Sequence, residues 1–429
     1  MKANAPQSVQ LSEFAGQLAS ENAWEYQLAS SRSSRDVAGQ THDALQSPLE
    51  FPSIEAAIVD GDRVALAVDP NVPQVCEVLT GILKTLAMTE AGGVDIVLWD
   101  EASDATMDAV REIAGNAATV HRHDSCHRES LRYLAADKEA TPIYLNRLLV
   151  DADFVLPVVS SRTMDALGGH DLTGVFPSLA DSATRHRHRQ RMVNTEMAND
   201  DGDEAQIPWL LGVHMIVAVD VNTNGSVADV VAGTPEAIRH KIKQEKSSSE
   251  TSTQQDEQNA ELVIASLDGD AQQQTWANAA RALAAATRYV AVGGTIVLWT
   301  AIKQPPHGPL AHLDDIDDAS TVLLTEPVEA FALGDDNDDE SELDFPRWDE
   351  QLSTASTFAR ILAEHRVVLR SLLSNDAVEP IGVGIVEDET QLVHLSKSFS
   401  SCGILRSAQF ADSTVDAPHR LNDKFNQND

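Results

Sequence analysis

The chain has 429 residues, with 31 lysines and arginines against 67 aspartates and glutamates, and so a formal net charge of −36 at pH 7. A surface this acidic repels nucleic acids and anionic membranes, and we expect neither as a partner. The three cysteines are widely spaced, and the sequence has neither an apolar leader nor a run of about 20 apolar residues, which predicts a cytoplasmic protein without disulfides or membrane spans.

The length predicts two domains, since one hydrophobic core rarely serves a chain of this size. The sequence KSSSETSTQQDEQN at 246–259 has no apolar residue and is typical of a linker. We therefore expect the following division: a polar N-terminal arm over 1–50, a first domain over 51–245, a linker over 246–260, a second domain over 261–415 and a polar tail over 416–429.

In the first domain, short apolar runs typical of strands alternate with segments whose apolar residues have helical spacing. Apolar residues of the first helix repeat every three or four positions between Val75 and Leu86, and Gly92 and Gly93 follow as a stop. The expected order is strand 64–68, helix 75–86, strand 96–99, helix 105–114 and strand 117–120. This order predicts a parallel sheet with right-handed crossovers, whose ligands collect at the carboxyl ends of the strands. Asp69 and the His123-Asp124 pair lie just beyond two such ends.

The stretch 151–191 combines an apolar run, glycines and a basic cluster. Residues 154–159 predict a buried strand, and Gly168 and Gly169 follow it, an arrangement that brings backbone N–H groups close to a phosphate or carboxylate. The cluster at 185–191 contains Arg185 and Arg187 and is the main basic island of an acidic chain. Two interpretations stay open: an anion site for a nucleotide phosphate or carboxylate, and a surface helix end paired with neighbouring acids.

Predicted strands and helices also follow one another through the rest of the chain. Residues 207–221 are expected to be strand, with a turn at 222–225, a second strand at 227–231 and a helix that Thr234 caps and Pro235 begins. In the second domain we expect a strand at 262–265, a helix at 275–289, a strand at 295–299, a helix at 348–364 and a strand at 381–386. The acidic stretches 314–318 and 334–344 are expected to be solvated loops.

Four segments together resemble the N-terminal domain of the lactate racemase family, which uses a nickel-pincer nucleotide. They are DPNVP at 69–73, HRHDS at 121–125, ATPIYLNRLLVDADFVL at 140–156 and GGHDLTGVFPSLADSATRHRH at 168–188. The hairpin after 207 and the strand–helix–Gly-Gly–strand order of the second domain resemble the same family. The resemblance implies an α/β fold of two domains with parallel or mixed sheets and an interdomain cleft.

The resemblance also implies roles for individual residues, with departures from the family pattern. His123 and Asp124 match the His-Asp pair, and His188 falls within one position of the nickel histidine. His170 is the substitute near the second acid/base histidine, whose own position falls at Thr163. Thr173 stands where the family has the lysine that tethers the nucleotide, and no lysine occurs from 139 to 240. The implied cofactor contacts are Asp69, Gly168, Gly169 and Thr173.

At the positions that the family uses for its substrate, Asn278 and Arg281 replace a Gln…Lys pair. Val72 replaces the arginine that the family has after the first strand. Arg281, Arg185 and Arg187 are then the candidates to hold an anion. Two functions follow: racemase- or epimerase-type chemistry on a small 2-hydroxy acid with an altered site, or non-catalytic binding of a small carboxylate or a nucleotide on the same scaffold.

Other site patterns are weaker. The group His121, His123, Cys126 and His127 could ligate zinc or nickel, but its spacing matches no standard site, and we favour histidines that face solvent. The dinucleotide, P-loop and hydrolase glycine motifs are absent from the sequence.

Overall fold

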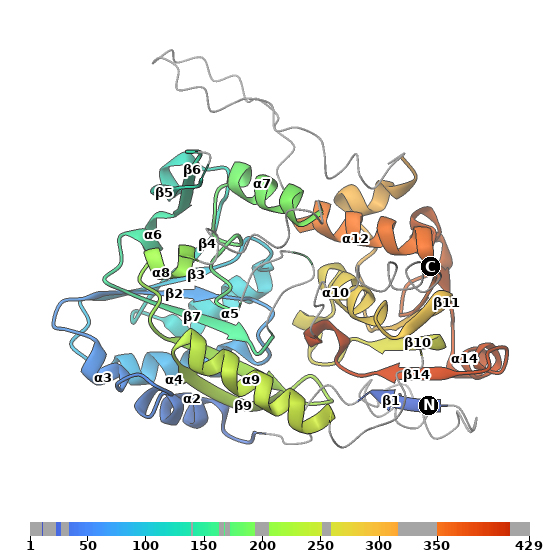
Figure 1. Cartoon of the computed structure of the whole chain (residues 1–429), viewed down its shortest axis with the longest axis horizontal. Coiled ribbons are helices and arrows are strands. Elements are labelled where there is room, and N and C mark those ends of the chain that lie inside the picture. The colour runs from blue at the N-terminus through green and yellow to red at the C-terminus, as the bar shows by residue number, and fades with distance from the viewer. Residues whose placement is uncertain are drawn as a thin grey trace, which may run out of the picture.

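The computed structural model describes residues 11, 23–26, 34–138, 140–162, 167, 172–193, 206–250, 259–315 and 350–411. Two α/β domains lie side by side in Figure 1, each built on a six-stranded sheet. This confirms the predicted fold class. Within the described ranges no helix is both long and apolar enough to cross a bilayer.

The sheet of the first domain has the order β4-β3-β2-β7-β8-β9. Its strands are β2 (Arg63–Val68), β3 (Gly93–Leu98), β4 (Thr119–Arg122), β7 (Phe154–Ser160), β8 (Ile216–Val221) and β9 (Val227–Gly233). All neighbours are parallel except β8 and β9, which form an antiparallel hairpin. The crossover helices α4 (Val75–Leu86) and α5 (Asp104–Ala114) lie where the apolar spacing predicts them.

Helices cover both faces of this sheet, and strand β2 shows how. Val64, Leu66 and Val68 face a core shared with α4, α5 and α2 (Val37–Gln46), whereas Ala65 and Ala67 face the opposite core. That second core includes α6 (Arg147–Val150), α8 (Ile207–Leu210) and α9 (Pro235–Glu250). A strand covered on both faces needs apolar residues at every position, which explains its continuous apolar run. The helix α3 (Ile54–Ala57) packs beside α4.

The sheet of the second domain is parallel throughout, in the order β1-β14-β10-β11-β12-β13. Its strands are β1 (Ala23–Tyr26), β10 (Ala260–Ser266), β11 (Val290–Trp299), β12 (Arg366–Arg370), β13 (Gly384–Ile385) and β14 (Cys402–Leu405). Helices α10 (Trp276–Ala286) and α12 (Glu350–Glu364) cover one face, and α14 (Glu389–Ser396) packs on the other, with α13 (Asn375–Val378) near β13.

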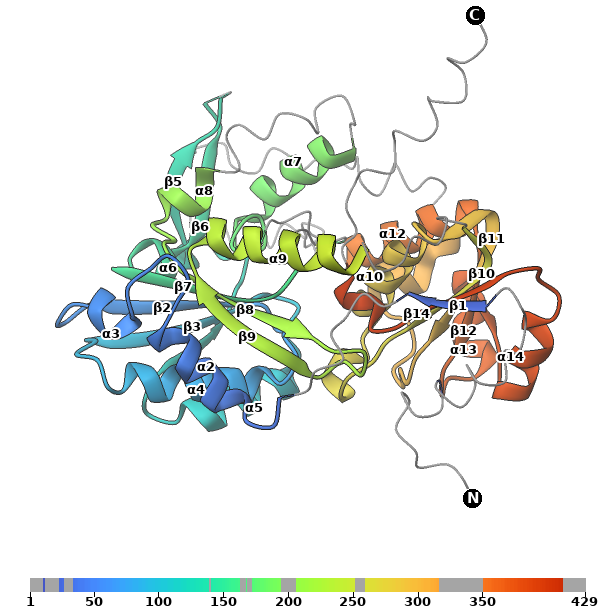
Figure 2. The ribbon, with the colours of Figure 1, turned by 60° about the horizontal axis from the view of Figure 1, so that its bottom comes forward.

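The N-terminal arm contacts both domains. Strand β1 extends the second sheet beside β14, as Figure 2 shows, and Leu11 is buried in a core of that domain. Helix α2, which follows along the chain, packs instead on α4 and β9 of the first domain. The arm therefore packs on both domains, as a strand on the second and a helix on the first.

The structure corrects several local expectations. Residues 207–210 form α8, and β8 begins only at Ile216, since Pro208 suits the first turn of a helix better than an internal strand. Helix α9 continues to Glu250, so the first residues of the expected linker are helical, and 251–258 lie outside the described residues. The expected strand at 381–386 is reduced to β13. The acidic stretch 334–344 and the tail 416–429 also lie outside the described residues.

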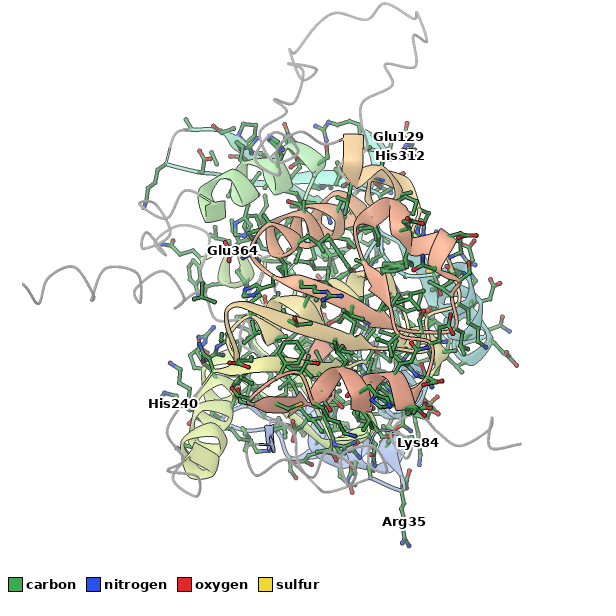
Figure 3. All side chains as sticks on the ribbon, turned by 90° about the vertical axis from the view of Figure 1, so that its right-hand side faces the viewer. Arg35, Lys84, Glu129, His240, His312 and Glu364 are labelled. Carbon is green, nitrogen blue, oxygen red and sulfur yellow. The ribbon has the colours of Figure 1, made fainter. Side chains whose placement is uncertain are left out.

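Several structural elements had no counterpart in the predicted elements, among them strands β1, β12 and β14 and a hairpin. The hairpin consists of β5 (Leu131–Ala136) and β6 (Pro142–Asn146), preceded by a short 3-10 turn at Arg128–Ser130. Its outer surface carries Tyr133 against Tyr144. Charged side chains such as Arg35 and Lys84 project away from the sheets in Figure 3, in contrast to the arginines described below.

Candidate functional site

The carboxyl ends of the parallel strands in the two sheets face each other across the domain interface. The end of β7 contacts the segment after β14, and the end of β2 contacts the segment after β10. The turn between β8 and β9 contacts both of these second-domain segments. The domains pack tightly at this turn, because a Cβ on Gly225 would lie 2.4 Å from backbone atoms of Asp268 and Gly269. The interface is therefore where an α/β architecture is expected to place its ligand.

Asp69, at the end of β2, is a buried and fully engaged carboxylate. Its Oδ1 accepts from the backbone and side-chain amides of Asn71, and its Oδ2 accepts from Arg162 at 3.0 Å and from Ser160. Arg162 also donates to the carbonyl oxygen of Gln409 in the second domain, at 3.2 Å. Both oxygens of the residue expected to contact the cofactor are thus engaged within the first domain, and Arg162, which Oδ2 binds, connects this group to the second domain.

Arg281 and Asn278, the residues expected to hold a substrate anion, lie together on α10. Arg281 is only 2% exposed, and it donates to Asn278 Oδ1 at 3.1 Å and to Glu101 Oε2 at 3.1 Å. Glu101 follows β3 in the first domain, so this ion pair crosses the interface. The amide of Asn278 donates in turn to Gln273, whose own amide reaches the carbonyl oxygen of Asn71. A buried guanidinium on one domain thus binds a carboxylate from the other.

The basic cluster on α7 (Ser182–Val193) has its two arginines with described side chains in different surroundings, Arg185 buried and Arg187 partly exposed. Arg185 donates to both oxygens of Asp100, at 2.6 Å and 3.4 Å, and its side chain is 6% exposed. Arg187 donates to the carbonyl oxygen of Pro142 and to the hydroxyl of Thr184. Arg185 thus pairs with a neighbouring acid, as the second interpretation expects, but this pair is buried and not at the protein surface. The anion site stays a prediction.

His123 is buried, and both of its ring nitrogens are within hydrogen-bond distance of a partner. Nε2 lies 2.9 Å from the carbonyl oxygen of Ala180, and Nδ1 lies 3.2 Å from Nδ2 of Asn146. Burial lowers the pKa of His123, Asp100 opposes this shift, and Arg185 adds to it. The imidazole is therefore neutral at neutral pH, and in this arrangement it has no nitrogen left for a substrate proton.

Asp124, the partner of His123 in the predicted pair, faces solvent. Its Oδ1 accepts from the backbone amides of Cys126 and His127, so the carboxylate caps a turn. Among the described residues no three His, Cys, Asp or Glu side chains are close enough to hold a metal ion. His127 lies on the surface, as the preferred interpretation of these histidines expects, and the partly exposed His121 lies 3.4 Å from Asp95. The interpretation is wrong for His123, which is buried.

The residues around Thr173 do not fit a nucleotide that is tethered through a lysine. Thr173 is buried, its hydroxyl accepts from Val175 N, and a threonine has no amine for the tether. Next to it, a Cβ on Gly174 would lie within 2.9 Å of Val159 and Trp99, which leaves no room beside the backbone there. His188, the expected nickel ligand, is buried with its ring against Phe176 at a centroid distance of 5.3 Å. Gly168, Gly169 and His170 lie outside the described residues.

The residues around this interface that the sequence did not single out include Arg162, Asp100, Glu101 and Gln273. A signal existed for the first three, since each lies one to three residues beyond the end of an expected strand. In a chain with 67 acidic residues, however, that position alone does not single out an acid.

The comparisons with known proteins concern the fold. No protein-family model matches the chain, and no curated protein sequence matches it. The lactate racemase apoprotein from Thermoanaerobacterium thermosaccharolyticum is a structural match with a TM-score of 0.65 and 15% identity, covering 92% of this chain and 95% of that one. A structural-genomics protein from Thermotoga maritima matches with a TM-score of 0.55 and 12% identity, over 86% of this chain and 95% of that one. The chain therefore has a lactate-racemase-like fold.

Proposed function

We propose that this protein binds a small carboxylate, such as a 2-hydroxy acid, between its two domains, with Arg281 as the anion-binding group. One observation carries the proposal: the buried guanidinium of Arg281 is oriented by Asn278 and already binds a carboxylate, that of Glu101. A guanidinium presents a planar set of N–H donors that matches a carboxylate, and burial strengthens the interaction. The interface thus has the chemistry and the location of a carboxylate site.

A small carboxylate fits this site better than a nucleotide phosphate does. Among the described residues, the buried Arg162, Arg185 and Arg281 each form an ion pair with a carboxylate. Because each of these guanidinium charges is already balanced by a carboxylate, these arginines favour a singly charged ligand over a multiply charged phosphate. A ligand with a single negative charge needs to replace only one of these carboxylates.

Racemase- or epimerase-type chemistry on a 2-hydroxy acid is the second candidate, and the likeness of fold over nearly the full length supports it. Such chemistry needs a base for the hydroxyl proton and an acceptor for a hydride. His123 is the base that the resemblance implies, but it would first have to give up its bond to Ala180 or to Asn146. The acceptor would need an anchor other than Thr173. Binding without this chemistry is therefore our first proposal.

Two measurements on the purified full-length chain separate the candidates. The first is thermal unfolding with L-lactate, D-lactate, glycolate and AMP, with sodium chloride at matched ionic strength as the control. The second is metal analysis combined with a chiral assay for the interconversion of L- and D-lactate. We expect the hydroxy acids to raise the melting temperature, AMP to have no effect, and the lactates not to interconvert. Interconversion by a nickel-containing sample would overturn the proposal in favour of the enzyme, and stabilisation by AMP alone would replace the carboxylate with a nucleotide.

A further inference from the structure

Glu101 occupies the site that the proposed function assigns to a ligand. Its Oε2 lies 3.1 Å from the Arg281 guanidinium, and the two side chains are 8% and 2% exposed. Glu101 belongs to the first domain and Arg281 to the second, so the carboxylate reaches Arg281 from outside its own domain, as the carboxylate of a bound ligand would.

The two oxygens of Glu101 differ in their contacts. Oε2 accepts from Arg281, whereas Oε1 is buried and has no hydrogen-bond partner among the described residues. Asp69, in the parallel ion pair with Arg162, uses both oxygens and accepts four hydrogen bonds. A buried carboxylate oxygen without a donor costs free energy. The Glu101 pair is thus the less complete of the two, and the easier one for a competing carboxylate to replace.

Glu101 also lies on a segment that can release it. It occupies the turn between β3 and α5, where Ala102 N bonds to the carbonyl oxygen of Trp99 and Ser103 caps the helix through Thr106 N. These bonds fix the turn and the start of the helix without using the Glu101 side chain. The side chain can therefore rotate away from Arg281 while the backbone on either side keeps its hydrogen bonds.

From these contacts we infer that Glu101 is a built-in competitor, which occupies the anion site on Arg281 until a small carboxylate displaces it. This inference rests on the proposed function, because it concerns the same arginine. Displacement reduces the apparent affinity by the fraction of molecules in which Arg281 is free. Glu101 thereby sets the ligand concentration at which the protein responds and excludes anions that bind a guanidinium more weakly than a carboxylate does.

The test is isothermal titration of L-lactate and glycolate into the full chain, for the wild type and Glu101→Gln. The amide keeps the size of the side chain and removes its charge, so we expect the dissociation constant to fall by about tenfold or more. Asp104→Asn is the matched control, because it removes one negative charge three residues away, from an exposed side chain that pairs with Arg122, and we expect no change. In the double variant Glu101→Gln/Arg281→Gln the gain should disappear.

The outcomes distinguish the inference from the proposed function. Weaker binding by Glu101→Gln would mean that Glu101 contacts the ligand, and it would overturn the competitor role while leaving the site at Arg281 in place. Equal affinity in the wild type and Glu101→Gln would also overturn it. If neither protein binds either hydroxy acid, the proposed function itself fails. Should Glu101→Gln not fold, Glu101→Asp withdraws the carboxylate by one methylene group, and the inference then requires a smaller gain in affinity with the charge unchanged.

Discussion

The side chain of Asn146 determines which nitrogen of His123 carries the proton. Asn146 Oδ1 accepts from the backbone amide of Leu148 at 3.0 Å, which places its NH₂ group towards Nδ1 of His123. Nδ1 must then be the acceptor, so the proton is on Nε2 and is donated to the carbonyl oxygen of Ala180. The candidate catalytic histidine is thus held as one neutral tautomer between β6 and the segment before α7.

Replacing Asn146 should destabilise the protein through His123. Asn146→Ala leaves the buried Nδ1 without a donor and removes the side-chain bond to Leu148, so we expect the free energy of unfolding to fall by about 1–3 kcal/mol. Denaturant unfolding measures this, with the exposed Asn116→Ala as the control. A loss no larger than that of the control would show that the contacts of His123 are not structural.

Burial also makes His123 a source of pH dependence. Its pKa is lowered in the folded protein, so the unfolded chain binds the proton more readily, and stability falls as the pH drops below the ordinary histidine value of about 6.5. We expect His123→Asn to reduce the slope of unfolding free energy against pH between about pH 5 and 7.5. The exposed His127→Asn should leave the slope as in the wild type. Identical slopes for all three proteins would contradict the assignment.

Asp268 should make the unfolding free energy change with pH in the direction opposite to that of His123. Burial raises its pKa, against the hydrogen bonds from Ser266 and Ser407 and the charge of Arg406, so folding binds a proton and stability falls as the pH rises above the unfolded value of about 3.8. The neutral variant Asp268→Asn should therefore gain stability relative to the wild type between about pH 4 and 7. The control is Asp60→Asn on the surface. A difference that shrinks with rising pH would refute this account of Asp268.

The three thiols should react at different rates. Cys126 is exposed, whereas burial raises the pKa of Cys402 to about 12 and also raises that of Cys76. Because the thiolate is the reactive form, a chromogenic disulfide reagent at about pH 8 should modify Cys126 first, and Cys402 only when the protein unfolds. Cys126→Ser should remove the fast phase. A fast phase that survives this substitution would place a second reactive thiol on the surface.

Gly225 tests the packing of the two domains. Its φ of +73° strains any other residue, and a Cβ there would also collide with the backbone of Asp268 in the second domain. Gly293 has a φ of +72° with nothing within 4 Å, so Gly293→Ala carries the strain without the collision. We expect Gly225→Ala to cost more unfolding free energy than Gly293→Ala, and to enlarge the molecule in solution scattering. Equal costs would mean that the domains do not meet at this turn.

The alternation of strands and helices from β2 to β4 could be predicted from the sequence. Short apolar runs mark the strands, and apolar residues at helical spacing mark the helices between them. Strand β14 was missed since its four residues, Cys402–Leu405, are too few to show a period. Strand β1 was missed because its place in the second sheet depends on pairing with a strand 379 residues later, Ala23 with Cys402. Pairings of that kind leave no local signal.

The candidate site was predicted in part. Asn278 and Arg281 lie together at the domain interface, but their partner Glu101 is 180 residues away in the chain and is one of 67 acidic residues. Arg185 was recognised as part of a basic cluster, but a run of alternating His and Arg does not reveal which members face inwards. The pairing of each arginine with a specific acid follows from the fold of both domains and not from local sequence.

The most direct test of the central claim is a calorimetric titration of L-lactate into the wild type and into Glu101→Gln/Arg281→Gln. The double variant replaces the ion pair with two neutral amides, and so avoids the unpaired buried charge that would cost about 3–5 kcal/mol in Arg281→Gln alone. Arg366→Gln, at an exposed position in the second domain, controls for the loss of one positive charge. We predict saturable binding to the wild type and the control and none to the double variant. Undiminished binding to the double variant would show that Arg281 does not hold the carboxylate.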